Sequence, residues 1–266
     1  ALLEPDERAR VKGLIVNKFR GDRTILNPGL RQLEALCGVP VAGVVPYTHV
    51  DVDERIGIRS ILVLKELQQK YRDQIRLQIV AFPQEGNVER PGTYAALARA
   101  MAAGADLVGG IPAAERDPQA HIDMIFDLAE KYDADVDMHI DETDDPESHT
   151  LLQLAQTAIR RGWQGRVTAG HLCSLAAVPP EKQRETLEQV KAAGIRVISL
   201  PSTNLYLQGR HDAWNVRRGI APIKRIAEEF RIPTALASDN IRDPFNPFGN
   251  GSPLQTALIA AHGCHM

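Results

Sequence analysis

Strand and helix signals alternate along the whole chain, and this alternation restricts its fold more than any other feature. Eight short apolar runs are each followed by a segment with helical periodicity. The expected strands span residues 11–17, 39–52, 75–82, 105–111, 134–140, 166–171, 195–200 and 233–239. The expected helices span residues 27–38, 58–71, 94–103, 121–132, 148–161, 181–193, 221–230 and 253–262. Such an alternation predicts an α/β architecture with parallel strands.

The number of units favours a closed (β/α)8 barrel of the TIM type, because eight strand–helix pairs in 266 residues match its size. A doubly wound open sheet is the alternative. Polar residues follow several strands and do not gather at one switch point, which favours the barrel. In the strand expected at 134–140 the even-numbered residues are apolar. Asp137, His139 and Asp141 share the opposite face and are expected to point inward.

Four polar side chains lie at or just after the ends of the fifth, sixth and eighth expected strands. They are His139, Glu142, His171 and Asp239. The carboxyl ends of parallel strands meet at one face, and two imidazoles with two carboxylates can hold a divalent metal and activate water. Each residue alone could be a hydrogen-bonded structural residue or a cap. Together the four indicate metal-assisted hydrolysis.

Other polar residues give weaker signals. Gln84 follows the third expected strand and could pair with an amide-like ring edge. Five histidines fall on expected helices or loops, and we expect them at the surface: His121, His149, His211, His262 and His265.

Composition excludes several classes of partner. Lys and Arg number 31 against 34 Asp and Glu, and no block of like charge occurs, so neither nucleic acid nor a membrane surface is expected. No apolar run approaches the roughly 18 residues of a membrane span. Three cysteines without paired spacing and an N-terminus without a signal-peptide core suggest the cytoplasm. The chain lacks an initial Met and stops within an expected helix, which suggests a fragment.

Several longer stretches carry a resemblance to a known family. They are THVDV (48–52), LQIVAFPQEG (77–86), HIDETDD (139–145), TAGH (168–171), NLYLQGR (204–210), RRGI (217–220) and SDNIRDPFNPFG (238–249). From Thr48 onward the chain resembles bacterial cytosine deaminase and its relatives in the amidohydrolase superfamily. The resemblance implies a (β/α)8 barrel with one iron or zinc ion that hydrolytically deaminates a small heterocyclic substrate.

The resemblance also implies roles for the four polar residues. His139 and Asp239 would ligate the metal, and Asp239 would also take a proton from the attacking water. Glu142 would move a proton to the ring nitrogen and the leaving amine. His171 would hydrogen-bond the water and the developing alkoxide.

Three further residues would contact the substrate by the same resemblance. Gln84 would read the carbonyl and amide edge of the base, and Phe245 would lie beside the ring. Asn240 departs from cytosine deaminase, which has an acidic residue there. This departure leaves cytosine, a triazine, a pterin or another cyclic amide open as the substrate.

Residues 1–47 resemble a different family. ERARVKGLIVNKFRGD (7–22) and GVPVAGVVPY (38–47) are similar to an internal piece of cobyric acid synthase. The join near Tyr47 and Thr48 suggests a chimera. We expect a single barrel over residues 1–266, in which residues 1–47 supply the first strand and helix and residues 48–266 the rest. The flanking β-sandwich of the deaminase family would be absent.

The family's metal site begins with a His-x-His at the end of strand one, and this sequence contains none. Catalytic zinc sites usually have three protein ligands. Lys18 would add an opposing positive charge, while His49 and Asp51 are expected to be structural. We therefore expect the metal to be weakly bound or absent and the activity to be impaired. The alternative is a catalytically inactive chimeric barrel scaffold, and uncovered apolar surface would favour a homo-oligomer.

Overall fold

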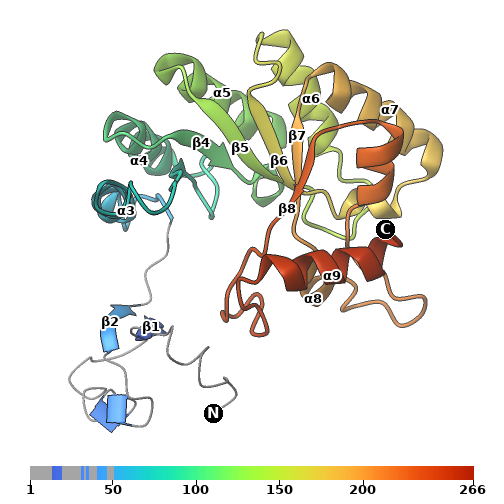
Figure 1. Ribbon diagram of the computed structural model, residues 1–266. Coiled ribbons are helices and arrows are strands. Elements are labelled where there is room, and N and C mark those ends of the chain that lie inside the picture. The colour runs from blue at the N-terminus through green and yellow to red at the C-terminus, as the bar shows by residue number, and fades with distance from the viewer. Residues whose placement is uncertain (1–13, 20–30, 33, 36–40, 47–50) are drawn as a thin grey trace. The chain divides into compact units, whose positions relative to one another are not determined.

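A computed structural model describes residues 14–19, 31–32, 34–35, 41–46 and 51–266 (Figure 1). The chain divides into two compact units, Ala1–His49 and Val50–Met266. In the first unit, β1 (Leu14–Phe19) and β2 (Val41–Pro46) form a parallel two-stranded sheet.

Several predictions for the first unit stay untested. Residues 27–30, 33 and 36–38 of its expected helix, and His49, lie outside the described residues. That residues 1–47 supply the first unit of one barrel stays a prediction.

The second unit is built on a six-stranded parallel sheet in the order β3–β4–β5–β6–β7–β8. Its strands are β3 (Val80–Ala81), β4 (Leu107–Gly110), β5 (Asp135–Ile140), β6 (Val167–His171), β7 (Arg196–Ser199) and β8 (Thr234–Leu236). The predicted α/β class with parallel strands is therefore confirmed. Within the described residues this sheet is open, with β3 and β8 at its edges.

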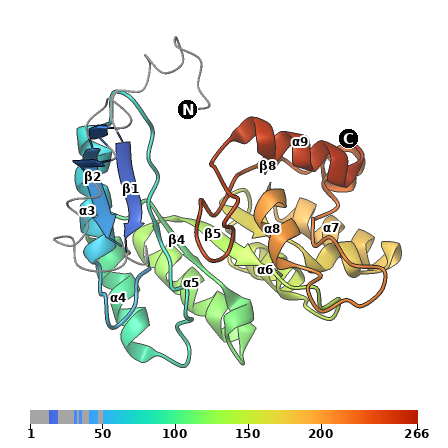
Figure 2. The ribbon, with the colours of Figure 1, turned by 90° about the horizontal axis from the view of Figure 1, so that it is seen from below.

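Helices connect the strands of the second unit. They are α3 (Arg59–Lys70), α4 (Pro91–Ala102), α5 (Pro118–Tyr132), α6 (Thr150–Arg160), α7 (Pro180–Ala192), α8 (Pro201–Leu207) and α9 (Pro253–Cys264). Shorter turns are η1 (Pro112–Ala114), η2 (Ser174–Ala177) and the π-helical η3 (Arg225–Glu229). Helices α5 and α6 cover one side of the sheet, whereas α8 and α9 lie together beyond its other side (Figure 1, Figure 2). None of the described helices has the length and apolar character of a membrane span.

Proline fixes where many of these helices begin. Helices α4, α5, α7, α8 and α9 each carry proline in the first turn, where the missing N–H costs no hydrogen bond. Asp117 caps α5 by accepting from the Ala120 N–H, and Ser252 caps α9 by accepting from the Gln255 N–H.

The alternating pattern of β5 holds in the structure. Val136, Met138 and Ile140 are buried among the core side chains, as their alternation predicts, and this face packs with apolar residues such as Phe126 of α5. The opposite face carries Asp137 and His139. The core therefore fixes which side of β5 presents polar groups.

Two expected elements differ from the structure, and one observed helix was not expected. Strand β3 is shorter than the expected 75–82, because side chains replace strand pairing before it: Asp106 accepts from the Ile79 N–H, and Gln68 donates to the Leu77 carbonyl. The helix expected at 221–230 contains only the turn η3 within a short helical stretch. Helix α8 was not predicted.

Candidate active site

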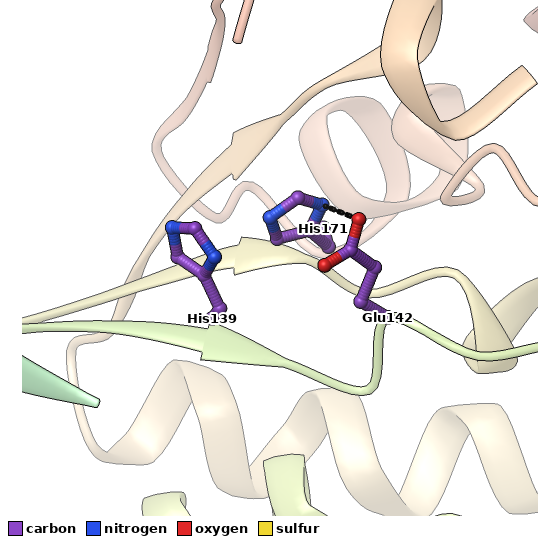
Figure 3. Close-up of side chains that lie close together, drawn as sticks. All are labelled: His139, Glu142 and His171. Atoms are coloured by element: carbon purple, nitrogen blue, oxygen red, sulfur yellow. Dashed lines mark ion pairs between the residues drawn. The ribbon is translucent and has the colours of Figure 1, made fainter. Parts of the chain in front are cut away.

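The ends of two neighbouring strands bring three predicted site residues together. His139 is the penultimate residue of β5, Glu142 follows β5 by two residues, and His171 ends β6. The strand register places Ile140 opposite His171. One ligand atom from each of the three side chains lies within 4.8 Å of the others (Figure 3).

The two imidazoles are in contact and uncharged. Their ring centroids are 4.5 Å apart at an interplanar angle of 64°. The ring centroid of Phe82 lies 4.6 Å from that of His139. Burial lowers the pKa of His139 to about 4. Burial, with the nearby His139, lowers the pKa of His171 well below its usual value. Both rings are therefore neutral near pH 7 and can offer lone pairs or N–H donors.

The backbone turns sharply where His171 leaves the sheet. His171 has a φ of 74° and Leu172 a φ of 57°, two consecutive residues in the left-handed region. This conformation is costly for residues with a side chain and persists only where the surroundings hold it. The Leu172 N–H donates to the Ile140 carbonyl at 2.9 Å, which holds the turn against β5.

Glu142 is a partly buried carboxyl group with a displaced pKa. Its Oε1 lies 3.3 Å from Nδ1 of His171 (Figure 3). Burial, reinforced by the negative charge of Asp239, raises the pKa of Glu142 to about 7. Its backbone carbonyl accepts from Gln208 at 3.2 Å. Glu142 can therefore gain and lose a proton near neutral pH.

Asp239 follows β8 by three residues and is not among the three side chains whose ligand atoms lie within 4.8 Å of one another, but its charge acts on Glu142. Burial raises the pKa of Asp239 to about 6, against hydrogen bonds from Thr203 and the Asn240 N–H. Its φ is 59°, and its Oδ2 is buried without a hydrogen-bond partner in the described part of the chain. A buried oxygen of this kind is open to an external partner.

The donor set suits a divalent cation. His171 Nε2 is also buried without a partner among the described residues, so two unsatisfied atoms accompany His139 and Glu142. Neutral imidazole nitrogens and carboxylate oxygens are the ligands of zinc and iron sites. The residues present therefore fit a metal ion.

The three residues expected at the substrate lie in loops after β3 and β8. The Gln84 side chain is exposed, and its backbone N–H donates to buried Asp51 at 2.9 Å. Asn240 donates to Asp243 at 2.7 Å, and Phe245 is 52% exposed. Their contacts with a substrate stay predictions.

Two expectations were wrong. Asp141 does not point inward, because its φ of 49° ends the strand alternation. Its carboxylate instead holds the start of α6, accepting from Ser148, Thr150 and Leu151. His121 is fully buried and not at the surface, because α5 packs it against Glu115, whose Oε1 lies 3.2 Å from Nδ1.

One buried residue beside the site was not singled out from the sequence. Asn204 is 0% exposed, and its Nδ2 lies 2.9 Å from Nδ1 of His171. It begins the stretch NLYLQGR, but the helix α8 that carries it was not expected. Pro201 in the first turn of α8 was the signal that could have revealed it.

Comparison with protein families gives a match over most of the chain. The model described as "Amidohydrolase family" matches residues 45–265. The pterin deaminase of Rhizobium rhizogenes is 36% identical over 221 residues, 82% of this chain and 50% of that protein. The N-isopropylammelide isopropyl amidohydrolase of Pseudomonas sp. is 32% identical over 214 residues, 80% of this chain and 50% of that protein. The chain thus spans about half the length of these curated relatives.

Two solved structures are also similar to this chain. The 5-methylcytosine deaminase of Klebsiella pneumoniae, liganded with phosphonocytosine, superimposes with a TM-score of 0.77 at 37% identity, covering 85% of this chain and 55% of that one. The N-isopropylammelide isopropylaminohydrolase of Burkholderia multivorans gives a TM-score of 0.70 at 27% identity, covering 93% and 64%.

A short segment matches a second family. The cobyric acid synthase of Photorhabdus laumondii is 57% identical over 58 residues, 22% of this chain and 11% of that protein. Both predicted resemblances are thereby confirmed. That the chain is a chimera stays a prediction.

Proposed function

Because the chain belongs to the amidohydrolase family, we propose that it hydrolytically deaminates a cyclic amidine. In such a reaction water adds to the ring carbon that bears the amino group, and ammonia leaves. The convergence of His139, Glu142 and His171 at the carboxyl ends of β5 and β6 carries this proposal. Asp239, close enough to raise the pKa of Glu142, supplies the second carboxylate.

His139 and Asp239 would hold the divalent cation, iron or zinc, with His171 and Glu142 beside it. A divalent cation in this place lowers the pKa of a water molecule toward about 7 and so supplies the nucleophile. The neutral ring of His139 supports these assignments, as does Oδ2 of Asp239, which has no hydrogen-bond partner in the described residues.

The two carboxyl groups would divide the proton transfers. Asp239, with a pKa of about 6, is ionised at neutral pH and can accept a proton from water. Glu142, with a pKa of about 7, can hold that proton and deliver it to the ring nitrogen and the leaving amine. His171 would hydrogen-bond the oxygen on which negative charge develops.

The substrate would be a flat nitrogen heterocycle. The relatives are named for pterin, N-isopropylammelide and 5-methylcytosine. In this chain the exposed amide of Gln84 would pair with the ring edge, with Asn240 and Phe245 beside the ring.

We further propose that the cation is held weakly and that activity is correspondingly impaired. His139 and Asp239 are two ligands where catalytic sites usually have three, and the sequence contains no His-x-His. Chelator competition with zinc-loaded protein tests this: we expect rapid loss of the ion. A stoichiometric ion that resists the chelator would contradict it.

Ammonia release tests the proposed function. The chain, with added zinc or ferrous iron, is incubated with pterin, 5-methylcytosine and cytosine, beside Glu142→Gln and the control Glu147→Gln. Glu147 makes the same chemical change at an exposed position. We expect release that Glu142→Gln abolishes and Glu147→Gln preserves. No release with the cation bound would instead support the inactive scaffold.

A further inference from the structure

Among the described residues, the side chain of Asn204 hydrogen-bonds one other side chain, that of His171. The amide lies on α8, is 0% exposed, and places Nδ2 2.9 Å from Nδ1 of the ring. Its Oδ1 is buried without a hydrogen-bond partner in the described part of the chain. Leaving an amide oxygen buried and unpaired costs about 1–3 kcal/mol. The contact with the ring is therefore the hydrogen bond that the described residues give to this amide side chain.

This contact decides where the proton of a neutral His171 lies. An amide nitrogen carries only donors, so Nδ1 must be the acceptor. A neutral imidazole has one protonated nitrogen, and the proton is then on Nε2. Figure 3 shows Nε2 on the side of the ring that faces His139, and this atom is buried without a partner among the described residues.

Glu142 favours the other position of the proton, on Nδ1. Its Oε1 lies 3.3 Å from the same Nδ1, and a carboxylate there favours an Nδ1–H donor. The two neighbours therefore compete for one nitrogen. The Asn204 contact is the shorter one, at 2.9 Å.

We propose that Asn204 is a positioning residue that keeps the proton of His171 on Nε2. An Nε2–H is a donor, so His171 would stabilise negative charge on an oxygen and would not serve as a metal ligand through Nε2. Among the described residues this leaves ligation to His139 and Asp239. It also gives the two histidines different roles, one as a ligand and the other as a donor. The catalytic consequence rests on the proposed function, whereas the proton position does not.

The neighbour of Asn204 supports a positioning role for the start of α8. Thr203 hydrogen-bonds the carboxyl group of Asp239, and its Oγ1 lies 3.4 Å from the Ser238 carbonyl. Consecutive residues of α8 thus contact groups that follow β6 and β8.

Nitrogen NMR of the metal-free protein at pH 7.5 reads the proton position directly. Histidine labelled with 15N gives distinct chemical shifts for protonated and unprotonated ring nitrogens, and His171→Gln identifies the His171 signals by their loss. We expect Nε2 protonated and Nδ1 unprotonated in the unsubstituted chain. The reverse assignment there overturns the proposal without any further variant.

Two substitutions at Asn204 test the cause. In Asn204→Asp the new carboxylate accepts from Nδ1–H, and in Asn204→Leu only Glu142 remains, so the proton should move to Nδ1 in both. Gln183→Leu is the control, because Gln183 is a buried amide that donates to the carbonyls of Leu175 and Val178. Folded Asn204 variants that keep the proton on Nε2 overturn the proposal, as does a reversal in Gln183→Leu.

Steady-state kinetics then tests the consequence. Asn204→Asp should lower kcat for ammonia release by tenfold or more with little change in KM, because the donor acts on charge that develops after binding. An unchanged kcat with a reversed proton overturns the assigned donor role. If the unsubstituted chain releases no ammonia, the proposed function fails while the NMR result still decides the role of Asn204.

Discussion

The rings of His139 and His171 meet nearly edge to face, with centroids 4.5 Å apart at an interplanar angle of 64°. Strand register produces this contact, because Gly170 pairs with His139 and the next residue is His171. Burial lowers the pKa of both rings, so two imidazoles share a small volume without mutual charge repulsion. Such a pair suits a site that binds a cation and polarises water.

Glu142→Gln should stabilise the chain at alkaline pH. The folded-state pKa of about 7 exceeds the ordinary value of 4.5, so the buried carboxyl binds its proton more tightly when folded. Its contribution is fully present below pH 4.5 and is lost as the pH rises through 7. In urea unfolding, the free energy of unfolding of the variant should rise relative to that of the unsubstituted chain by on the order of 3 kcal/mol between pH 4 and pH 9. An unchanged difference across that range would contradict the buried charge.

Asp141→Ala should destabilise the chain by about 3 kcal/mol, because four hydrogen bonds to its carboxylate anchor the start of α6. Thermal unfolding measures the loss. Asp145→Ala is the control, because the exposed Asp145 carboxylate accepts from the Glu147 N–H alone among the described residues. This substitution should cost about 0.5 kcal/mol. Equal losses in the two variants would show that Asp141 is not an anchor.

Gly86→Ala should destabilise the loop that carries Gln84. Gly86 has a φ of 87°, and an added Cβ would lie 2.5 Å from Oε1 of Glu115. That carboxylate also accepts from the Asn87 and Val88 N–H groups, so displacing it disrupts the loop. We expect a loss of about 2–4 kcal/mol in urea unfolding.

Gly162→Ala separates backbone strain from the clash. Gly162 has a φ of 72° with open space around it, so its substitution should cost only about 1 kcal/mol. If Gly86→Ala is as stable as Gly162→Ala or more stable, the role assigned to Glu115 is contradicted.

The strands that position the site were predicted from the sequence more accurately than the residues that surround the site. The apolar alternation of Val136, Met138 and Ile140 oriented β5 correctly, and the ends of β5 and β6 followed from their polar boundaries. Periodicity stops being informative where the backbone enters the left-handed region. Asp141 was placed on the inner face for that reason, although its φ of 49° turns it toward α6.

Contacts between distant segments were beyond sequence reasoning. His121 reads as a polar helix residue, and only the packing of α5 shows that its ring is buried against Glu115. The contact of Asn204 with His171 joins residues 33 positions apart and depends on the path of α8. Neither relationship leaves a spacing that a single sequence reveals.

Cation stoichiometry tests the central claim most directly. The chain, His139→Asn and the control His149→Asn are dialysed to equilibrium against excess zinc, and bound metal is taken as the difference in zinc between the two compartments; His149 is exposed. We predict that zinc is held by the unsubstituted chain and by the control, at one ion or less per chain because binding is weak, and is lost from His139→Asn. Equal zinc in all three proteins, or none in any of them while excess zinc is still present, would contradict a cation site at the ends of β5, β6 and β8.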